Sequence, residues 1–367
     1  MSTLRSSLAA ATAAALLLLP ATAGAHPRAL DSALDRVVAA GAPGTVALAG
    51  GRTAAAGVAD VRTGRPLRAG DAVRIGSITK SFTAVVALQL VGEGRLRLDD
   101  TLGRRLPGVL PYGDRITLRQ LLNHTSGVPD DLATPLLGLY RGDPFRVWTP
   151  AETIALIRDQ PPRFPAGTGW AYSNTEYVLI GLMIERVTGD TLERQLDRRI
   201  VRPLGLRHTS FPVRSSGLGR DASRGYSLDF GPSGPVAGTL RDLTDYSPSF
   251  AWAGGNGVST VRDVARFYRS LLRGRLLAPR LLRQALAGVE TGRPGRRYGF
   301  GLELRDTPYG TLVGHEGDLP GFSIKALSSR DGRRQAVVAV NLKFAPPAVD
   351  DAFDAAGDAA VRAAFPG

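Results

Sequence analysis

The chain has 367 residues, of which 43% are hydrophobic and 22% charged, and it contains no cysteine. This size fits one large globular domain or two closely joined ones, and the missing cysteines exclude a thiolate metal site and a cysteine nucleophile. The formal net charge of +13 comes almost wholly from dispersed arginines. Because no basic run with interleaved aromatic residues occurs, nucleic acid is not expected as a partner.

The first 25 residues are predicted to be a signal peptide. Arg5 precedes the apolar run "AAATAAALLLLPATA", and "AGA" offers a small-residue cleavage site after Ala25. A retained anchor helix is the alternative, but the apolar run is short and Pro20 interrupts it. No later segment approaches the roughly 20 apolar residues that cross a bilayer. We therefore expect a mature protein, residues 26–367, that is secreted and either extracellular or associated with the cell wall, without a membrane anchor.

Hydrophobic periodicity predicts the elements of the first part of the chain. Residues 30–40 have helical spacing, and residues 44–61 alternate as a strand pair with glycines at the turns. The stretch "SITKSFTAVVALQLVGEG", residues 77–94, predicts a strong helix that ends at its glycines. Residues 101–250 contain helical patterns and long loops rich in Pro and Gly.

Strands return near the C-terminus. A helix at residues 260–274 leads into four predicted strands, and a closing helix is predicted for residues 350–365; the strands are "YGFGLELRD", "GTLVGHEG", "GFSIKALSS" and "RQAVVAVNL". Since strands occupy both ends of the chain, we expect one sheet in a lobe formed by residues 26–100 and 251–367. A mostly helical lobe, residues 101–250, is inserted between these two parts.

Lys80 is unusual because the chain has only three lysines among its 46 basic residues. Ser77 lies three residues before it at the start of the predicted helix, so the hydroxyl and the amine share one face. The helix macrodipole disfavours a cation in the first turn, and burial would further lower the pKa of the amine. A lysine can lose its proton in a protein, whereas an arginine cannot. A neutral Lys80 could therefore take the proton of Ser77 and make the serine a nucleophile.

Two further motifs follow in the chain. "FPAGTGWAYSN" carries Tyr172 and Asn174 in a loop that opens into a helix, and "VGHEGDLPGF" places His315 and Gly317 at a strand end. Each motif alone is compatible with an ordinary role: a core tyrosine, a helix cap or a turn. A tyrosine can also relay a proton, and an asparagine can bind a substrate amide.

Taken together, "SITK", "YSN" and "HEG" resemble the three signatures of the serine penicillin-recognising enzymes. The chain is most similar to exported D-alanyl-D-alanine carboxypeptidases, which are related to class C β-lactamases, and the resemblance runs from about Leu30 to Asn341. It implies an α+β fold of the β-lactamase/transpeptidase type. An antiparallel sheet flanked by helices would face the inserted helical lobe, with the active site between them.

The resemblance also assigns roles to residues. Ser77 would be acylated, while Lys80 and Tyr172 would shuttle its proton. The backbone N–H groups of Ser77 and of Ser323, or a near neighbour, would hold the oxyanion. The residues expected to bind substrate are Asn174, Trp252, Arg305, His315 and Ser323. We expect no metal and no cofactor, a monomer, peptidoglycan peptides or small esters and amides as substrates, and β-lactams as acylating inhibitors.

One position departs from the family. A carboxypeptidase must recognise a free carboxylate, for which the resemblance offers Arg305, and the family keeps Thr in the middle of the third motif. This chain has Glu316 there. If Glu316 points into the site, its charge would repel a carboxylate, but if it points away or pairs with Arg305, peptidase activity could survive.

Other functions remain open. An esterase or a class C-like β-lactamase on the same fold is the nearest alternative, and a non-catalytic wall-binding homologue is an alternative of another class. A zinc hydrolase is disfavoured because the four histidines form neither a His-x-His nor an HExxH pair. A nucleophilic pair of His124 and Ser126 is also conceivable, although packing is the simpler role for the segment "NHTSG".

Overall fold

The computed structural model describes residues 25–219, 221–231, 234–236 and 239–365. The predicted signal peptide lies outside these residues except for Ala25, with which helix α1 (Ala25–Ala39) begins, so the signal peptide stays a prediction. Within the described ranges, every helix is too short or too polar to span a bilayer.

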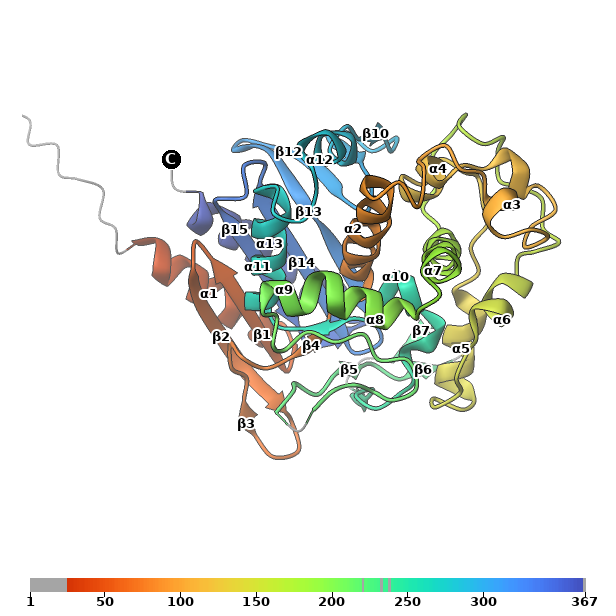
Figure 1. Cartoon of the computed structure of the whole chain (residues 1–367). Coiled ribbons are helices and arrows are strands. Elements are labelled where there is room, and N and C mark those ends of the chain that lie inside the picture. The colour runs from red at the N-terminus through yellow and green to blue at the C-terminus, as the bar shows by residue number, and fades with distance from the viewer. Residues whose placement is uncertain (1–24, 220, 232–233, 237–238, 366–367) are drawn as a thin grey trace, which may run out of the picture.

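A nine-stranded sheet forms the centre of the molecule (Figure 1), and all its neighbouring strands pair antiparallel. The strands from the two ends of the chain meet where β1 pairs with β15, with Thr45 opposite Val340. This confirms the predicted α+β fold. In spatial order the strands are β10 (Val289–Glu290), β11 (Arg296–Tyr298), β12 (Glu303–Thr307), β13 (Gly310–Leu319), β14 (Phe322–Ser329), β15 (Gln335–Val340), β1 (Gly44–Ala49), β2 (Arg52–Asp60) and β3 (Arg65–Pro66).

Helices cover both faces of this sheet. On one face α1 packs with α13 (Pro347–Ala364), and on the other lies α11 (Val261–Leu272) (Figure 1). Side chains alternate accordingly along β1: Ala47 and Ala49 join the core beneath α1 and α13, whereas Val46 and Leu48 join the larger core on the opposite face. Each strand residue therefore contributes to one of two hydrophobic cores.

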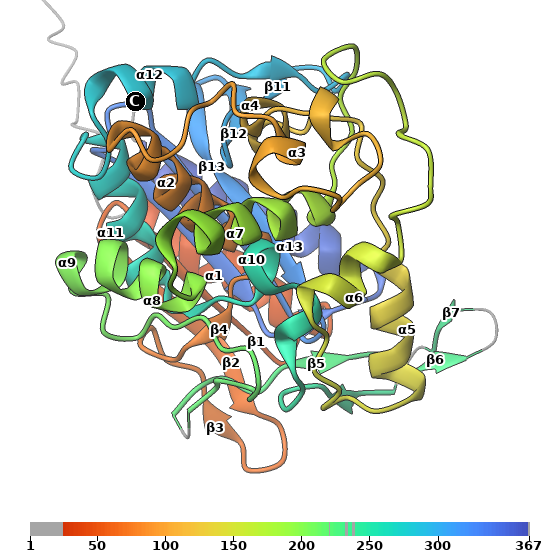
Figure 2. The same ribbon diagram turned by 45° about the vertical axis from the view of Figure 1, so that its right-hand side comes forward.

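The helical part of the chain lies beside the sheet, as Figure 2 shows. Its longest helix, α7, runs from Asn174 to Thr188 and is buried along most of its length. The remaining helices are α3 (Leu102–Arg105), α4 (Leu118–Leu122), α5 (Ala133–Arg141), α6 (Pro150–Ala155), α8 (Leu192–Leu196), α9 (Arg202–Leu204), α10 (Trp252–Gly255) and α12 (Pro279–Ala285). The short strands are β4 (Val73–Arg74), β5 (Tyr226–Ser227), β6 (Phe230–Gly231), β7 (Gly234–Pro235), β8 (Arg241–Asp242), β9 (Val258–Ser259) and β16 (Leu342–Lys343).

Helix α2 (Thr79–Gly92) stands between the sheet and the helical part, and a 3₁₀ turn, η1 (Gly76–Ile78), leads into it. The sequence suggested one broad apolar face, but the structure buries this helix on nearly every side. Its polar side chains therefore need internal partners: Ser81 donates to the carbonyl of Gly301 at 2.6 Å, and Thr83 to that of Ala253 at 2.7 Å. These bonds hold the start of α2 in place, and with it Ser77 and Lys80.

Candidate active site

Ser77 lies in η1, directly against strand β13. Two glycines make this close approach possible. A Cβ on Gly76, whose φ is +49°, would lie 2.6 Å from the backbone nitrogen of Asp318, and a Cβ on Gly317 would lie 2.0 Å from the carbonyl oxygen of Ile75. Because a side chain at either position would separate the turn from the strand, the final Gly of the third motif is a packing requirement.

The Lys80 amine is fully buried and has three partners. Its Nζ lies 2.7 Å from Oδ1 of Asn174, 2.9 Å from the carbonyl oxygen of Gly254 and 3.1 Å from Oγ of Ser77. Burial lowers the pKa of Lys80 to about 7, although the charge of Asp130 opposes the shift. A neutral amine has two N–H donors for the two carbonyl-type oxygens and one lone pair for the Ser77 proton. The geometry therefore suits a base that removes this proton.

Tyr172 is the second proton-carrying group beside Ser77. Its hydroxyl hydrogen-bonds the Ser77 side chain, and its ring centre lies 4.7 Å from Nζ of Lys80. Burial raises the pKa of Tyr172 well above its ordinary value, and the bond to Ser77 only partly opposes this. The phenol thus keeps its proton at neutral pH. Tyr172 is suited to give a proton to a leaving group, while Lys80 is suited to accept the proton of Ser77.

Both polar atoms of the Asn174 amide are occupied within the protein. Oδ1 accepts from Lys80, and Nδ2 donates to Oδ2 of Asp130 at 2.9 Å. Asp130 also accepts from the backbone N–H groups of Asn174 and Thr175, at 2.9 and 3.1 Å, and so caps the first turn of α7. Asn174 was expected to hold a substrate amide, but here its amide orients Lys80.

His315 forms part of the wall opposite Ser77. Its Nε2 lies 2.9 Å from the hydroxyl of Tyr298, and its Nδ1 contacts the carbonyl oxygen of Glu316. Burial lowers the pKa of His315 despite the nearby Glu303 carboxylate, so the ring is neutral at pH 7. A neutral ring satisfies both contacts if Nδ1 donates to the carbonyl and Nε2 accepts from the phenol.

A cavity of about 310 Å³ opens beside Ser77. Its lining mixes aromatic side chains with charged groups of both signs, and the lining residues come from the loop before α7 and from the sheet edge. They are Ser77, Trp170, Tyr172, Thr291, Arg293, Arg296, Arg297, Tyr298, Glu303, Leu304, His315, Glu316 and Asp318. Among the described residues, no cluster of His, Cys, Asp or Glu could hold a metal ion.

The N–H that could complete an oxyanion hole with that of Ser77 is the one of Asp318, because it lies against the turn at Gly76, and not that of Ser323. The backbone N–H of Glu316 points away from β14, and its nitrogen lies 3.4 Å from Oε1 of Glu303. Asp318 lies two residues further along β13. Strand alternation turns the N–H of Asp318 to the same side, next to Gly76 and Ser77. Ser323 pairs with Asp318 from β14, one strand farther from Ser77.

Arg305 is held by two carboxylates. Its Nη2 lies 2.6 Å from Oε2 of Glu303 and 2.8 Å from Oε1 of Glu316. The guanidinium is largely buried and is absent from the lining of the cavity, whereas Glu316 belongs to that lining. The expected contact between Arg305 and a substrate carboxylate is therefore not supported.

Trp252 also lies away from the cavity, contrary to the prediction that it binds substrate. Its indole N–H donates to Oε1 of Glu193 at 2.8 Å, and its ring packs against Gly181 of α7, where a Cβ would lie 2.9 Å from it. The side chain is buried in the larger core. Trp252 thus joins α7, α8 and α10 and does not contact the site.

The segment containing His124 and Ser126 forms a buried network beneath the site. Both side chains bond to the carboxyl group of Glu176, one to each oxygen, and not to each other. Burial raises the pKa of Glu176 and lowers that of His124, which keeps the pair uncharged. Ser126 therefore lacks the histidine contact that would make it a nucleophile, in agreement with a packing role.

Several site residues were not anticipated from the sequence: Asp130, Glu303 and Asp318. Asp130 stands 44 residues before its partner Asn174, and no local pattern joins the two. Asp318 directly follows "HEG", but its role comes from its backbone, which carries no residue-type signal. Glu303 lies in the predicted strand "YGFGLELRD", in which only Arg305 matched a role that the family resemblance implies.

Comparison with known proteins places these features in a family. Residues 30–361 match the family described as Beta-lactamase. The penicillin-binding protein 4* of Bacillus subtilis (strain 168) is 29% identical over 300 residues, which cover 78% of this chain and 64% of that protein. A D-aminopeptidase of Brucella anthropi is 30% identical over 291 residues, which cover 78% of this chain and 53% of the D-aminopeptidase. The chain thus spans between about half and two thirds of the length of these two relatives.

The architecture is shared more completely. The structure of a D-stereospecific amidohydrolase from a Streptomyces species has a TM-score of 0.78 and 37% sequence identity. The alignment covers 89% of this chain and 97% of that one. The match therefore includes both the sheet and the helical part, between which Ser77 and its neighbours lie.

The position of Lys80 predicts how acylation depends on pH. Because the neutral amine is the base, kcat/KM for an amide or ester should rise with pH through about 7 and then level off. Lys80→Arg should lower kcat/KM on the order of 10³-fold or more, since the guanidinium stays protonated. A pH series of initial rates measures both effects. Near-normal acylation in the arginine variant would show that only a positive charge is needed.

Asp130 predicts a different pH effect. Its charge raises the pKa of Lys80, so Asp130→Asn should move the rising limb of the pH profile to lower pH. Looser orientation of Asn174 should also lower kcat by about 10–100-fold. The matched control is Asp131→Asn, because Asp131 only caps the exposed turn at Thr134. An unshifted profile for Asp130→Asn, or an equal loss of kcat in the control, would contradict this role.

Proposed function

The chain belongs to the β-lactamase family and is a serine hydrolase of that fold, and from this premise we propose that it hydrolyses amides or short peptides of D-amino acids that carry a free amino group. The reaction would pass through an ester of Ser77. The catalytic groups are those that any member with this chemistry needs, so the substrate class must be argued from the cavity wall.

The charge of the inner wall carries the proposal. Glu303 and Glu316 share one closely bound guanidinium, that of Arg305. Two further cations lie at longer distances: Arg296 is 4.0 Å from Glu303 and 3.9 Å from Glu316, and Lys325 is 3.9 Å from Glu316. The Oε2 atom of Glu316 thus lacks a close partner among the described residues, and it faces the cavity that contains Ser77. A substrate ammonium group would complete this arrangement.

The proposed steps use groups already described. Oγ of Ser77 attacks the amide carbon while Lys80 accepts its proton, and the N–H groups of Ser77 and Asp318 hold the oxyanion. Tyr172 gives its proton to the leaving nitrogen and regains one from Lys80. A water molecule then attacks the ester carbon, and the hydroxyl of Ser77 is restored as the acid product leaves.

Similar proteins support the same class of substrate. The Brucella relative is called a D-aminopeptidase, and the Streptomyces structure is a D-stereospecific amidohydrolase. Both names describe amide hydrolysis with selection for the D configuration. For this chain that selectivity is a proposal, supported by the family and by the Glu316 carboxylate in the cavity lining.

A D-alanyl-D-alanine carboxypeptidase acting on peptidoglycan is the second candidate. Arg293 and Arg296 line the cavity and could meet a terminal carboxylate in place of Arg305. The name of the penicillin-binding relative supports acylation by β-lactams. An esterase or a β-lactamase needs only the shared catalytic groups, and the intact set disfavours a non-catalytic wall-binding homologue. Secretion and a monomeric state are part of the proposal in either case.

Substrate choice tests the two candidates. The wild type should hydrolyse D-alanine p-nitroanilide with a kcat/KM about tenfold or more above that of its N-acetyl derivative, as one charge-assisted contact implies. Glu316→Gln should reduce this preference, mainly through KM. Asp306→Asn is the matched control, because this exposed carboxylate is absent from the cavity lining.

The opposite preference would identify the second candidate. If N-acetyl-D-Ala-D-Ala is hydrolysed faster than both the free-amine anilide and the C-terminal amide of the same peptide, the enzyme recognises a carboxylate. In that case Glu316→Thr should improve the reaction further, and the amidohydrolase proposal is wrong.

A further inference from the structure

A second cavity lies between α3 and the C-terminal end of α7. Its volume is about 440 Å³, and four of its six lining residues are arginines: Arg95, Arg104, Arg105, Pro107, Arg186 and Val187. Thirteen residues of α7 separate Val187 from Asn174, which corresponds to roughly 20 Å of helix. A ligand here would therefore not contact the substrate at Ser77.

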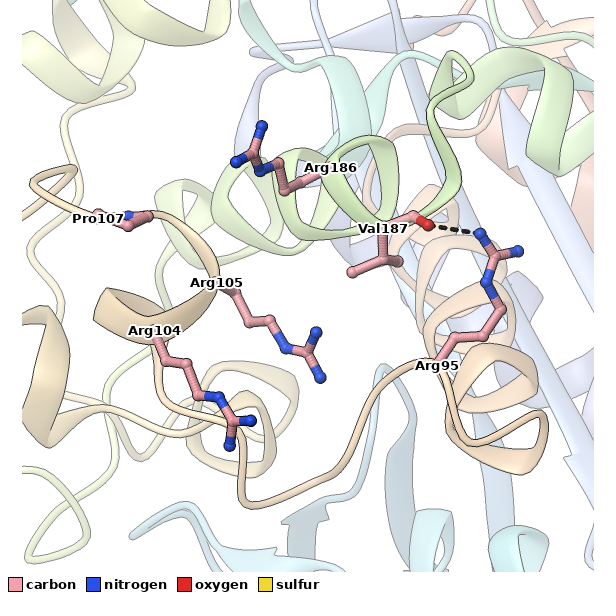
Figure 3. A pocket seen from close by; sticks show the side chains of 6 residues that line it. All are labelled: Arg95, Arg104, Arg105, Pro107, Arg186 and Val187. Carbon is pink, nitrogen blue, oxygen red and sulfur yellow. Dashed lines mark hydrogen bonds between the residues drawn. The ribbon is translucent and has the colours of Figure 1, made fainter.

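Three separate segments supply the arginines, as Figure 3 shows. Arg95 follows α2, Arg104 and Arg105 end α3, and Arg186 belongs to the last turn of α7. In the close-up, Arg105 extends into the space below Val187, and Arg95 extends along its other side to the carbonyl oxygen of Val187. Arg104 lies at the edge of this space, and the guanidinium of Arg186 points away from it. The arginines that line the cavity thus come from three segments and do not form a stripe along a single helix.

The positive charge of this cavity is only partly compensated. Asp100 is buried and bonds Arg105 at 2.9 Å, but its other oxygen lies 3.9 Å from Arg104. Glu93 lies 4.0 Å from Arg95 and is bound through both oxygens to Arg199.

The remaining arginine of the cavity has fewer polar partners than the other three. Arg186 makes no hydrogen bond or ion pair within the described part of the chain. Of the four guanidinium groups, only that of Arg105 therefore has a close carboxylate partner.

Helix ends explain part of this arrangement but not all of it. Arg95 donates to the carbonyl oxygen of Val187, a favourable place for a cation at a helix C-terminus. The electric field at this helix end does not explain why three further arginines line the same cavity. Like charges that line one cavity repel each other, and an anion bound within it would reduce that repulsion.

We propose that this cavity binds the phosphate group of an organic phosphate. A carboxylate presents one planar edge, which a single guanidinium fills, whereas a phosphate offers oxygens in several directions to guanidinium groups from opposite sides. The volume exceeds what one inorganic ion fills, and Pro107 and Val187 provide an apolar surface for the rest of the ligand. The site is independent of the function proposed for Ser77.

Calorimetric titration of the whole protein at low salt tests the proposal with three probes. Phenyl phosphate should bind about tenfold or more tightly than benzoate, which has the same ring and a planar anion. It should also bind more tightly than inorganic phosphate, which lacks the apolar part. Equal affinities for phenyl phosphate and benzoate would contradict a phosphate site, and no binding of phenyl phosphate would overturn the proposal.

Variants locate the binding. Arg95→Gln combined with Arg186→Gln should lower the affinity for phenyl phosphate about tenfold or more, and Arg104→Gln alone should lower it less. All three substitutions leave the ion pair of the buried Asp100 with Arg105 in place. The matched control combines Arg36→Gln with Arg158→Gln, two exposed arginines elsewhere that remove the same charge. If this control weakens binding equally, the attraction is general and the cavity is not a site.

Discussion

The burial of the Lys80 amine is the constraint on which the active site depends. A cation enclosed between α2, α7 and α10 would be costly, so the amine loses its proton near neutral pH and becomes a base for Ser77. Two requirements follow from this placement: Gly254 must present its backbone carbonyl oxygen to Nζ, and Asn174 must turn its side-chain amide oxygen toward it. Asp130 secures the second requirement by binding the other end of that amide.

The approach of η1 to β13 then provides the remaining chemistry. Gly76 and Gly317 allow the turn to touch the strand, which brings two backbone N–H groups to one point beside Ser77. The same strand carries Glu316 into the cavity, where it shares Arg305 with Glu303. Catalysis thus depends on backbone geometry that the fold sets, whereas the charge of the wall depends on a few side chains that can differ between relatives.

The three motifs and the strand patterns were enough to predict the fold and to bring Ser77, Lys80, Tyr172 and His315 into one place. The roles of the other site residues could not be predicted from the sequence, because they depend on contacts between segments that lie far apart in the chain. Asn174 is a motif residue, yet its amide is occupied by Lys80 and Asp130. Arg305 stands where a carboxylate-binding arginine was expected, but Glu303 on its own strand and Glu316 on the next strand bind its guanidinium. Trp252 is conspicuous in sequence and is buried against α7, since residue type alone does not show which way a side chain points.

The central claim is that Ser77 becomes acylated, with Lys80 as its base. Its most direct test is mass spectrometry of the intact and digested protein after brief incubation with benzylpenicillin above pH 7. The account predicts one covalent adduct on the peptide that contains Ser77, absent in Ser77→Ala and nearly absent in Lys80→Arg. An adduct on Ser126 or another serine, or undiminished labelling of Ser77→Ala, would contradict it.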